Sequence, residues 1–315
     1  MPLSSKFIIR SARYNENTHD GMMQNGKQAE GGATVKKGIN KWSFPGGTPI
    51  ADCLGIAKRA GYDGIELTLD ESGELGLQAT EKDARAIAAQ AEAAGVEICG
   101  LATGLYWSNG MTSESAAVRA RAMDICRKQL ELAAAFGVDT ILVVPGAVGV
   151  AFIPDFEVVD YEYAYDRALD AISRLADDAR AAGVNIGLEN VWNKFLLSPL
   201  ELRGFIDAVN SPYVGAYFDV GNVLATGYPE QWVRILGKRI KKVHVKDYRL
   251  EAGGLHGFVD LLAGDVDFPA VMNALEAVGY DGYLIAEMGT YKHDPYQMVY
   301  NTSLAMDRIL EGRRG

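Results

Sequence analysis

Two hydrophobic patterns alternate along this chain from residue 36 to its end. Short apolar runs, rich in β-branched residues, are too brief for a helix and are typical of strands buried on both faces. Between them lie longer stretches, such as 115–135, 163–181 and 268–277, in which apolar residues recur three and four positions apart, as in amphipathic helices. The short runs predict eight strands, over residues 37–43, 63–69, 96–102, 138–144, 184–189, 213–218, 240–246 and 282–287.

A glycine marks the point where a helical stretch passes into the next strand. The instances are Ala60-Gly61, Ala94-Gly95, Phe136-Gly137, Ala182-Gly183 and Val278-Gly279. Glycine adopts the left-handed conformation that closes a helix C-terminus without a steric penalty. The pattern therefore predicts a repeated unit in which each helix leads directly into a strand.

Strands that alternate with helices pair in parallel through right-handed crossovers. Eight such units in the 280 residues from 36 to 315 match the size of a (β/α)8 TIM barrel. A doubly wound open sheet is the alternative, but no GxGxxG motif follows the first expected strand. We therefore expect an α/β protein with one TIM-barrel domain over residues 36–315.

The first 35 residues do not share this pattern. Residues 11–33 are rich in Gly, Asn, Gln and Met without an apolar period, which predicts a flexible leader over residues 1–35. No export signal is recognised there, and no run in the chain approaches the ~18 apolar residues of a membrane span. A cytoplasmic location without a membrane partner is expected.

Charge and cysteine content narrow the function further. Lys and Arg number 31 against 41 Asp and Glu, a net charge of −10, which argues against a nucleic-acid partner because such binding depends on clustered cations.

The three cysteines, Cys53, Cys99 and Cys126, are scattered and form no CxxC pair. They are expected to be free thiols in a reducing compartment, packed in the core.

Chemistry-bearing side chains stand at the ends of four successive expected strands. They are Glu189, Asp219, His244 and Glu287, at spacings of 30, 25 and 43 residues. In a barrel the C-terminal ends of the strands form one rim, where active sites are built. These four side chains are therefore expected to converge although they are distant in sequence.

Three carboxylates and one imidazole at a common centre repel one another unless a cation lies between them. An oxygen-rich set with one nitrogen suits Mn²⁺, Mg²⁺ or Co²⁺ better than a structural zinc. One divalent ion is expected, Mn²⁺ first, with Mg²⁺, Co²⁺ and Zn²⁺ as alternatives. The other interpretation is that these are ordinary charged residues held in salt bridges.

Several motifs give the chain a family likeness. They are Gly187-Leu188-Glu189, Asp219-Val220-Gly221-Asn222, His244-Val245-Lys246-Asp247, Gly264-Asp265-Val266-Asp267 and Ala286-Glu287. From residue 36 on, the chain resembles the xylose-isomerase-like barrels of sugar and sugar-phosphate isomerases and epimerases. The resemblance implies Glu189, Asp219, His244 and Glu287 as ligands of one metal ion. It also implies that Glu189 and Glu287, on opposite faces of a ketose or ketose phosphate, move a proton through an enediolate, and that the protein is a homodimer or homotetramer.

Departures from the free-ketose 3-epimerase branch favour phosphorylated substrates. That branch often has His, Glu and Arg where this chain has Asn222, Leu196 and Leu250. The Asp-x-Gly-Asn and His-x-Lys-Asp forms look more like the branch that acts on ketose phosphates. Candidate substrate-binding residues are then Asn222 and, for the phosphate, Lys246, Lys194 and Arg249. The alternative for Lys246 is an ion pair with Asp247 that steadies the rim.

Other residues near the expected rim are candidates for the pocket. Trp42, Trp107 and Trp192 follow strands, where aromatic faces pack against the C–H face of a sugar. Glu66 is expected to bind the substrate or a neighbouring rim side chain, and His256 to cap the pocket. The long connection 145–160 is expected to cover the substrate.

Two further functions remain open. The same fold and ligand set resemble inosose and dehydroshikimate dehydratases, which are lyases, and a non-catalytic sugar-binding barrel is a third interpretation. Endonuclease IV relatives are excluded, because their multi-zinc site needs many histidines and this acidic chain has four.

Overall fold

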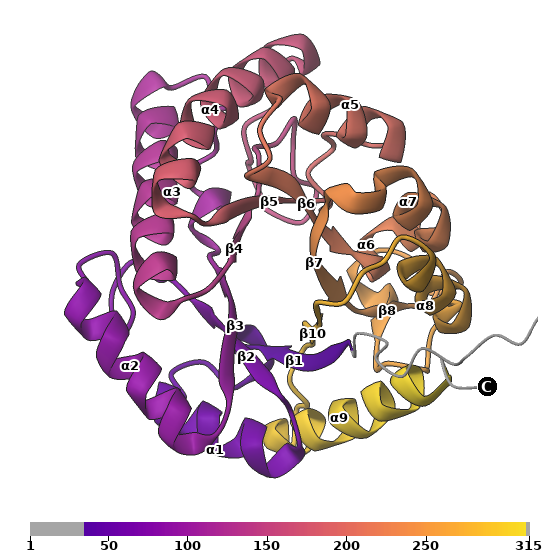
Figure 1. The fold of residues 1–315 in the computed structure, drawn as a ribbon. Coiled ribbons are helices and arrows are strands. Elements are labelled where there is room, and N and C mark those ends of the chain that lie inside the picture. Colours follow the sequence, from indigo (N-terminus) through magenta and orange to yellow (C-terminus); the bar gives the residue numbers. More distant parts are fainter. Residues whose placement is uncertain (1–34, 313–315) are drawn as a thin grey trace, which may run out of the picture. The chain divides into compact units, whose positions relative to one another are not determined.

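Eight parallel strands close into a barrel in the computed structural model, which describes residues 35–312 (Figure 1). The strands are β1 (Lys36–Asn40), β2 (Gly64–Thr68), β3 (Glu97–Ala102), β4 (Thr140–Val143), β5 (Asn185–Glu189), β6 (Val214–Asp219), β7 (Ile240–Val245) and β10 (Tyr283–Ala286). Each pairs with the next barrel strand along the chain, and β10 closes on β1. The expected TIM barrel is confirmed. The leader expected over residues 1–35 lies outside the described residues, except for the buried Val35.

Helices form a ring around the outside of the barrel (Figure 1). They are α1 (Ile50–Ala60), α2 (Glu81–Ala94), α3 (Ala116–Phe136), α4 (Tyr161–Ala182), α5 (Pro199–Val209), α7 (Pro229–Leu236), α8 (Phe268–Ala277) and α9 (Pro295–Glu311). Shorter elements are α6 (Val220–Leu224), the hairpin strands β8 (Asp247–Tyr248) and β9 (Phe258–Val259), and the 3-10 turns η1 (Lys41–Ser43), η2 (Leu105–Trp107), η3 (Gly237–Arg239) and η4 (Leu255–Gly257). The first strand is therefore shorter than expected, because η1 replaces its last three residues.

The helix ends confirm the glycine pattern. Gly61 and Gly95 follow α1 and α2 with φ of 84° and 69°, and their backbone N–H groups donate to the last carbonyls of each helix. At the other end of α2, Thr80 and Asp83 form a capping box, each side chain accepting from the other's backbone N–H. Local sequence signals thus set where these helices begin and end.

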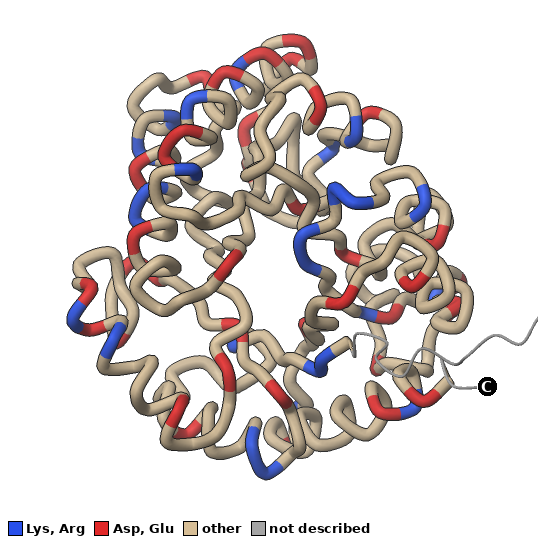
Figure 2. The backbone as a smooth tube through the Cα atoms, viewed as in Figure 1, with Lys and Arg blue, Asp and Glu red and all other residues tan. Residues whose placement is uncertain are grey.

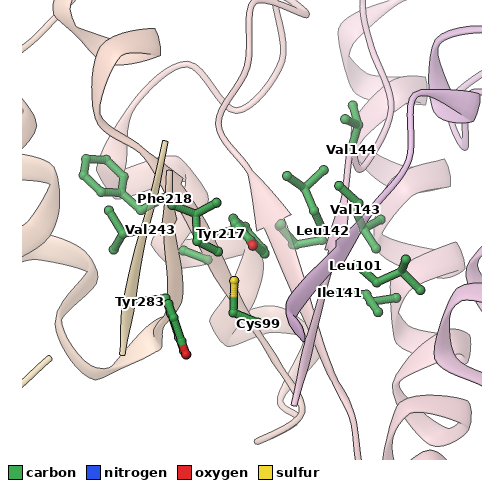
Figure 3. Packing of buried hydrophobic residues seen from close by; sticks show 14 of the residues in the cluster. Cys99, Leu101, Ile141, Leu142, Val143, Val144, Tyr217, Phe218, Val243 and Tyr283 are labelled. Atoms are coloured by element: carbon green, nitrogen blue, oxygen red, sulfur yellow. The ribbon is translucent and has the colours of Figure 1, made fainter. Parts of the chain in front are cut away.

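Two tyrosines fill the interior of the barrel because glycines on other strands leave room for them. A Cβ at Gly64 would lie 2.7 Å from the Tyr283 ring, and one at Gly187 would lie 2.8 Å from the Tyr217 ring. Both distances are below any real Cβ contact, so neither position accepts a larger residue without a shift. Figure 3 shows these tyrosines among the surrounding apolar side chains. Tyr217, on β6, reaches across the barrel, and its hydroxyl donates to Glu66 on β2.

Three further findings bear on the expectations from composition. Cys53, Cys99 and Cys126 are free and buried. Among residues 35–312, no helix is both long and apolar enough to cross a membrane. Lys and Arg are interleaved with Asp and Glu along the outer helices (Figure 2), and many of them pair at helical spacing. Charges of both signs therefore lie side by side on the outer helices.

We expect Leu101→Ala to lower the free energy of unfolding by about 2–5 kcal/mol, because it removes a fully buried side chain from a close-packed core. Leu304→Ala is the matched control. Its side chain on α9 is 66% exposed, so we expect a change within about 0.5 kcal/mol. Urea denaturation of the two variants measures both effects, and equal losses would contradict the described packing.

Candidate active site

Four side chains meet at the carboxyl end of the barrel, as the sequence predicts. Glu189, Asp219 and His244 lie at the ends of β5, β6 and β7, and Glu287 directly follows β10. One ligand atom from each lies within 4.8 Å of the others. The strand pairing explains this, because His244 stands in register with Asp219 on one side and with Ile285 on the other.

The atoms that face one another in this cluster lack hydrogen bonds. Asp219 Oδ2, His244 Nδ1 and Glu287 Oε2 are buried without a hydrogen-bond partner in the described part of the chain. Lys246 Nζ lies 3.1 Å from Asp219 Oδ2 and 3.0 Å from Glu287 Oε2, at ion-pair distance. Buried polar atoms are otherwise almost always hydrogen-bonded. The set therefore has the chemistry of a site for a divalent cation, with carboxylate oxygens and one imidazole nitrogen converging on one point.

The pKa values of the clustered side chains are shifted from their ordinary values, and not all in the same direction. Burial raises the pKa of Glu189 to about 7, and it also raises the pKa of Asp219. Burial acts in the same direction on Glu287, but the charges of Lys246 and His244 outweigh it and lower the pKa of Glu287 to about 2. Neighbouring carboxylates raise the pKa of His244 well above its ordinary value, although burial opposes them. A bound cation would relieve this imbalance by replacing the protons that the cluster otherwise holds.

Glu66 lies below the cluster and holds the imidazole of His244. Both side chains are fully buried, and His244 Nε2 lies 2.7 Å from Glu66 Oε2. A carboxylate only accepts hydrogen bonds, so Nε2 carries a proton and Nδ1 faces the cluster. Asn40 Nδ2 and the Tyr217 hydroxyl also donate to Glu66. Glu66 was expected to bind either the substrate or a neighbouring rim side chain. The structure shows the second, because Glu66 contacts His244.

A pair of asparagines holds Asp219 in place. Asn190 Nδ2 donates to the Asp219 carbonyl, and Asn190 Oδ1 accepts from the Asp219 N–H. The backbone N–H of Asn222 donates to Asp219 Oδ1 at 2.8 Å, which leaves Oδ2 free to face the cluster. Trp192 Nε1 donates to the Asn222 carbonyl, so the Trp192 side chain belongs to the same hydrogen-bond network.

A cavity of about 680 Å³ opens above the cluster. Six of the residues expected at the site line it: Trp42, Trp107, Trp192, Asn222, Lys246 and Glu287. The connection 145–160 reaches the cavity through Phe152, whose ring packs edge-on against Trp107 with centroids 5.5 Å apart. Whether this connection closes over a substrate stays a prediction.

Some expected contacts lie elsewhere. Arg249 is outside the lining of the cavity, because its Nη2 donates to the Ala263 carbonyl, and His256 is exposed in η4. The expected ion pair of Lys246 with Asp247 is wrong. Asp247 instead accepts from the backbone N–H groups of the chain near β8, and Lys246 turns to Asp219 and Glu287.

Sequence analysis missed three aromatic residues of the cavity and two partners in the networks. The aromatic residues are Phe152, Phe258 and Tyr291, and the partners are Asn190 and Tyr217. Asn190 was detectable, since it directly follows a predicted ligand at a strand end. Tyr217 reads as core from sequence, because nothing local indicates that its hydroxyl meets Glu66 from across the barrel.

Comparisons with known proteins agree with this architecture. L-ribulose-5-phosphate 3-epimerase UlaE of Salmonella paratyphi A is 26% identical over 261 residues, covering 81% of this chain and 87% of the relative. A solved L-ribulose 3-epimerase matches with a TM-score of 0.73 at 20% identity, over 89% of this chain and 96% of that one. A D-psicose 3-epimerase solved in the presence of D-fructose matches with a TM-score of 0.73 at 18% identity, over 89% and 100% of the two chains. The family model described as "Xylose isomerase-like TIM barrel" matches residues 54–307, and the chain belongs to that family.

Proposed function

We propose that this protein is a divalent-metal-dependent epimerase or isomerase of a keto sugar. The observation that carries the proposal is the set of buried atoms without hydrogen bonds on Asp219, His244 and Glu287, at the floor of an aromatic-lined cavity. The names of the relatives support the reaction class, since each is a sugar 3-epimerase.

The metal ligands in this proposal are Glu189, Asp219, His244 and Glu287. Three carboxylates with one imidazole favour Mn²⁺ over a metal that prefers sulfur. When bound, such an ion polarises a keto oxygen and stabilises the negative charge that develops as the neighbouring proton leaves. Asn190 and Glu66 hold Asp219 and His244 in the orientation that this requires.

The proton transfer falls to the two glutamates. One carboxylate takes the proton next to the carbonyl as general base, and the other returns a proton from the opposite face. A proton taken from C3 of a 2-keto sugar and returned to C3 from the opposite face inverts that carbon. A proton taken from C1 and returned to C2, together with transfer of the O1 proton to O2, converts the ketose into an aldose. Glu287 lines the cavity, and both glutamates lie beside His244 Nδ1, at 3.0 Å for Glu287 and 3.9 Å for Glu189.

Deuterium uptake measured by NMR tests the proposal directly. The purified protein would be incubated in D₂O with Mn²⁺ or with EDTA, against a panel of ketoses, ketose phosphates and inososes. Metal-dependent uptake at the carbon next to the carbonyl, with an epimer or aldose as product, supports the proposal. Loss of water from the substrate would instead assign a lyase, and absence of exchange with every compound would contradict both.

We expect Glu189→Gln and Glu287→Gln each to lower deuterium exchange by at least about 100-fold, because the amide neither takes nor returns a proton. Both variants should fold, since the substitution keeps the side-chain shape. Glu92→Gln, on the exposed face of α2, is the matched control and should retain full exchange. Retained activity in either active-site variant would refute the two-glutamate mechanism.

Glu66→Gln should weaken Mn²⁺ binding about 10–100-fold, since it removes the carboxylate that orients the His244 ring. Isothermal titration with MnCl₂ measures the affinity, and the manganese EPR spectrum reports the change in ligand geometry. Glu92→Gln again serves as the control. An unchanged affinity would mean that the imidazole is held by the barrel packing alone.

Lys246→Met should destabilise the metal-free protein by about 1–3 kcal/mol, because it leaves two buried carboxylate oxygens without a neighbouring positive charge. Excess Mn²⁺ should recover the lost stability, so that the ion raises the melting temperature more in the variant than in the parent. Lys238→Met, at an exposed position, is the control. Equal melting temperatures of parent and variant in EDTA would contradict the counter-charge role of Lys246.

A further inference from the structure

The backbone pairing between β1 and β10 ends just before the cluster. The sequence pattern predicts strand up to residue 43, but the last paired residues of β1 and β10 are Ile39 and Ala286. Beyond Asn40 the chain turns away from the ladder as η1. Glu287, which directly follows β10, therefore lies where β1 no longer supplies a backbone partner.

One side chain of η1 takes the place of the missing backbone partner. The fully buried Ser43 hydroxyl accepts a hydrogen bond from the Met288 N–H at 2.9 Å and donates to the Ala286 carbonyl oxygen at 3.5 Å. These two residues flank Glu287 in the chain. The Glu287 N–H itself donates to the Val245 carbonyl oxygen on β7 at 3.2 Å. The backbone around Glu287 is thus held from both sides, by the main chain of β7 and by one hydroxyl of η1.

The place of the Glu287 carboxylate depends on this backbone. Its Oε2 lies 3.0 Å from both Lys246 Nζ and His244 Nδ1. A cation bound at the cluster would compete with these two groups for the same oxygen, so neither contact would fix the carboxylate in the loaded protein. A group that moves a proton has to be placed within about 0.5 Å. For Glu287 that precision has to come from its backbone.

The same turn carries a wall of the cavity and is itself fixed to the network below the cluster. Asn40 is fully buried, and its Oδ1 accepts from the Trp42 N–H at 2.6 Å while its Nδ2 donates to Glu66. Trp42 lines the cavity, and Glu66 contacts His244. The start of η1 is therefore joined to the partner of His244, and its end to the chain beside Glu287.

From these contacts we propose that Ser43 is a positioning residue for Glu287. Its hydroxyl holds the backbone on both sides of that glutamate, and Asn40 sets the turn from which it does so. Because Trp42 belongs to the same turn, the cavity wall and the proton-transferring carboxylate are fixed relative to each other. This inference rests on the proposed function, since it gives Ser43 a part in placing a metal ligand that also carries a proton.

Amide exchange in the metal-free protein tests the contact itself. The chain has nine methionines, so ¹⁵N-methionine labelling gives few NMR signals, and Met288→Leu identifies the one from Met288. In EDTA we expect the Met288 N–H to exchange about tenfold faster in Ser43→Ala than in the parent, which is roughly what one hydrogen bond is worth. Unchanged exchange would overturn the inference.

Manganese binding tests the positioning role. We expect Ser43→Ala to weaken Mn²⁺ binding about tenfold in isothermal titration and to alter the manganese EPR spectrum, because contacts that orient a ligand contribute on that scale. Ser43→Cys should show both effects at smaller size, since a thiol keeps the packing but is a weak acceptor. It also replaces Ser43→Ala in these measurements if the alanine variant does not fold, and binding like that of the parent would then refute the role.

Ser303→Ala is the matched control. The Ser303 hydroxyl is also buried, accepts from Lys37 Nζ at 2.9 Å and donates to the Ala60 carbonyl, but Lys37 stands near the start of β1, away from the cluster. We expect both alanine variants to lower the urea midpoint to a similar extent and only Ser43→Ala to weaken Mn²⁺ binding. Equal weakening in the two variants, or faster Met288 exchange with unchanged Mn²⁺ affinity, would overturn the inference.

Failure of the proposed function gives a different result. If the parent protein binds no Mn²⁺, the metal-dependent reaction is refuted. The exchange of the Met288 N–H in EDTA still decides whether Ser43 holds the chain beside Glu287, so the two failures are distinguishable.

Discussion

The concentration of negative charge at the carboxyl end of the barrel is the constraint on which the rest of this structure depends. Three carboxylates and an imidazole lie within 4.8 Å of one another and are largely removed from water. Buried charges are tolerated only when they are paired or bind a metal. Lys246 places one positive charge beside Asp219 Oδ2 and Glu287 Oε2, and these two atoms together with His244 Nδ1 are those that a divalent ion would bind. Structure and proposed function thus follow from the same electrostatic requirement.

The barrel interior supports this cluster through a continuous chain of contacts. Glycines at 100 and 187 leave room for Tyr217, whose hydroxyl donates to Glu66, and Glu66 in turn fixes the imidazole of His244. A Cβ at Gly100 would lie 2.9 Å from the Tyr217 hydroxyl, so even a methyl group there would disturb the arrangement. Residues that read as packing from sequence therefore hold the Glu66 carboxylate that contacts the His244 ring.

The four-residue cluster and the cavity above it are built from different parts of the fold. Strand ends supply the four side chains of the cluster, and the strand pairing sets the distances between them. The connections after the strands supply the aromatic walls and the few charged groups of the cavity. Because connections vary without disturbing the barrel, the lining of the cavity can change while the cluster stays the same.

The sequence by itself determined the barrel, its eight strands and the four converging side chains. Hydrophobic periodicity and helix-closing glycines such as Gly61 are local signals, and parallel strands place their carboxyl ends on one rim whatever the details of packing. Only the tertiary structure decided the partners of Glu66 and Lys246, the displacement of Arg249 and His256 from the cavity, and the contribution of Phe152, Phe258 and Tyr291. The reason is that these contacts join residues far apart in the chain, and the paths of connections depend on what they pack against rather than on their own sequence.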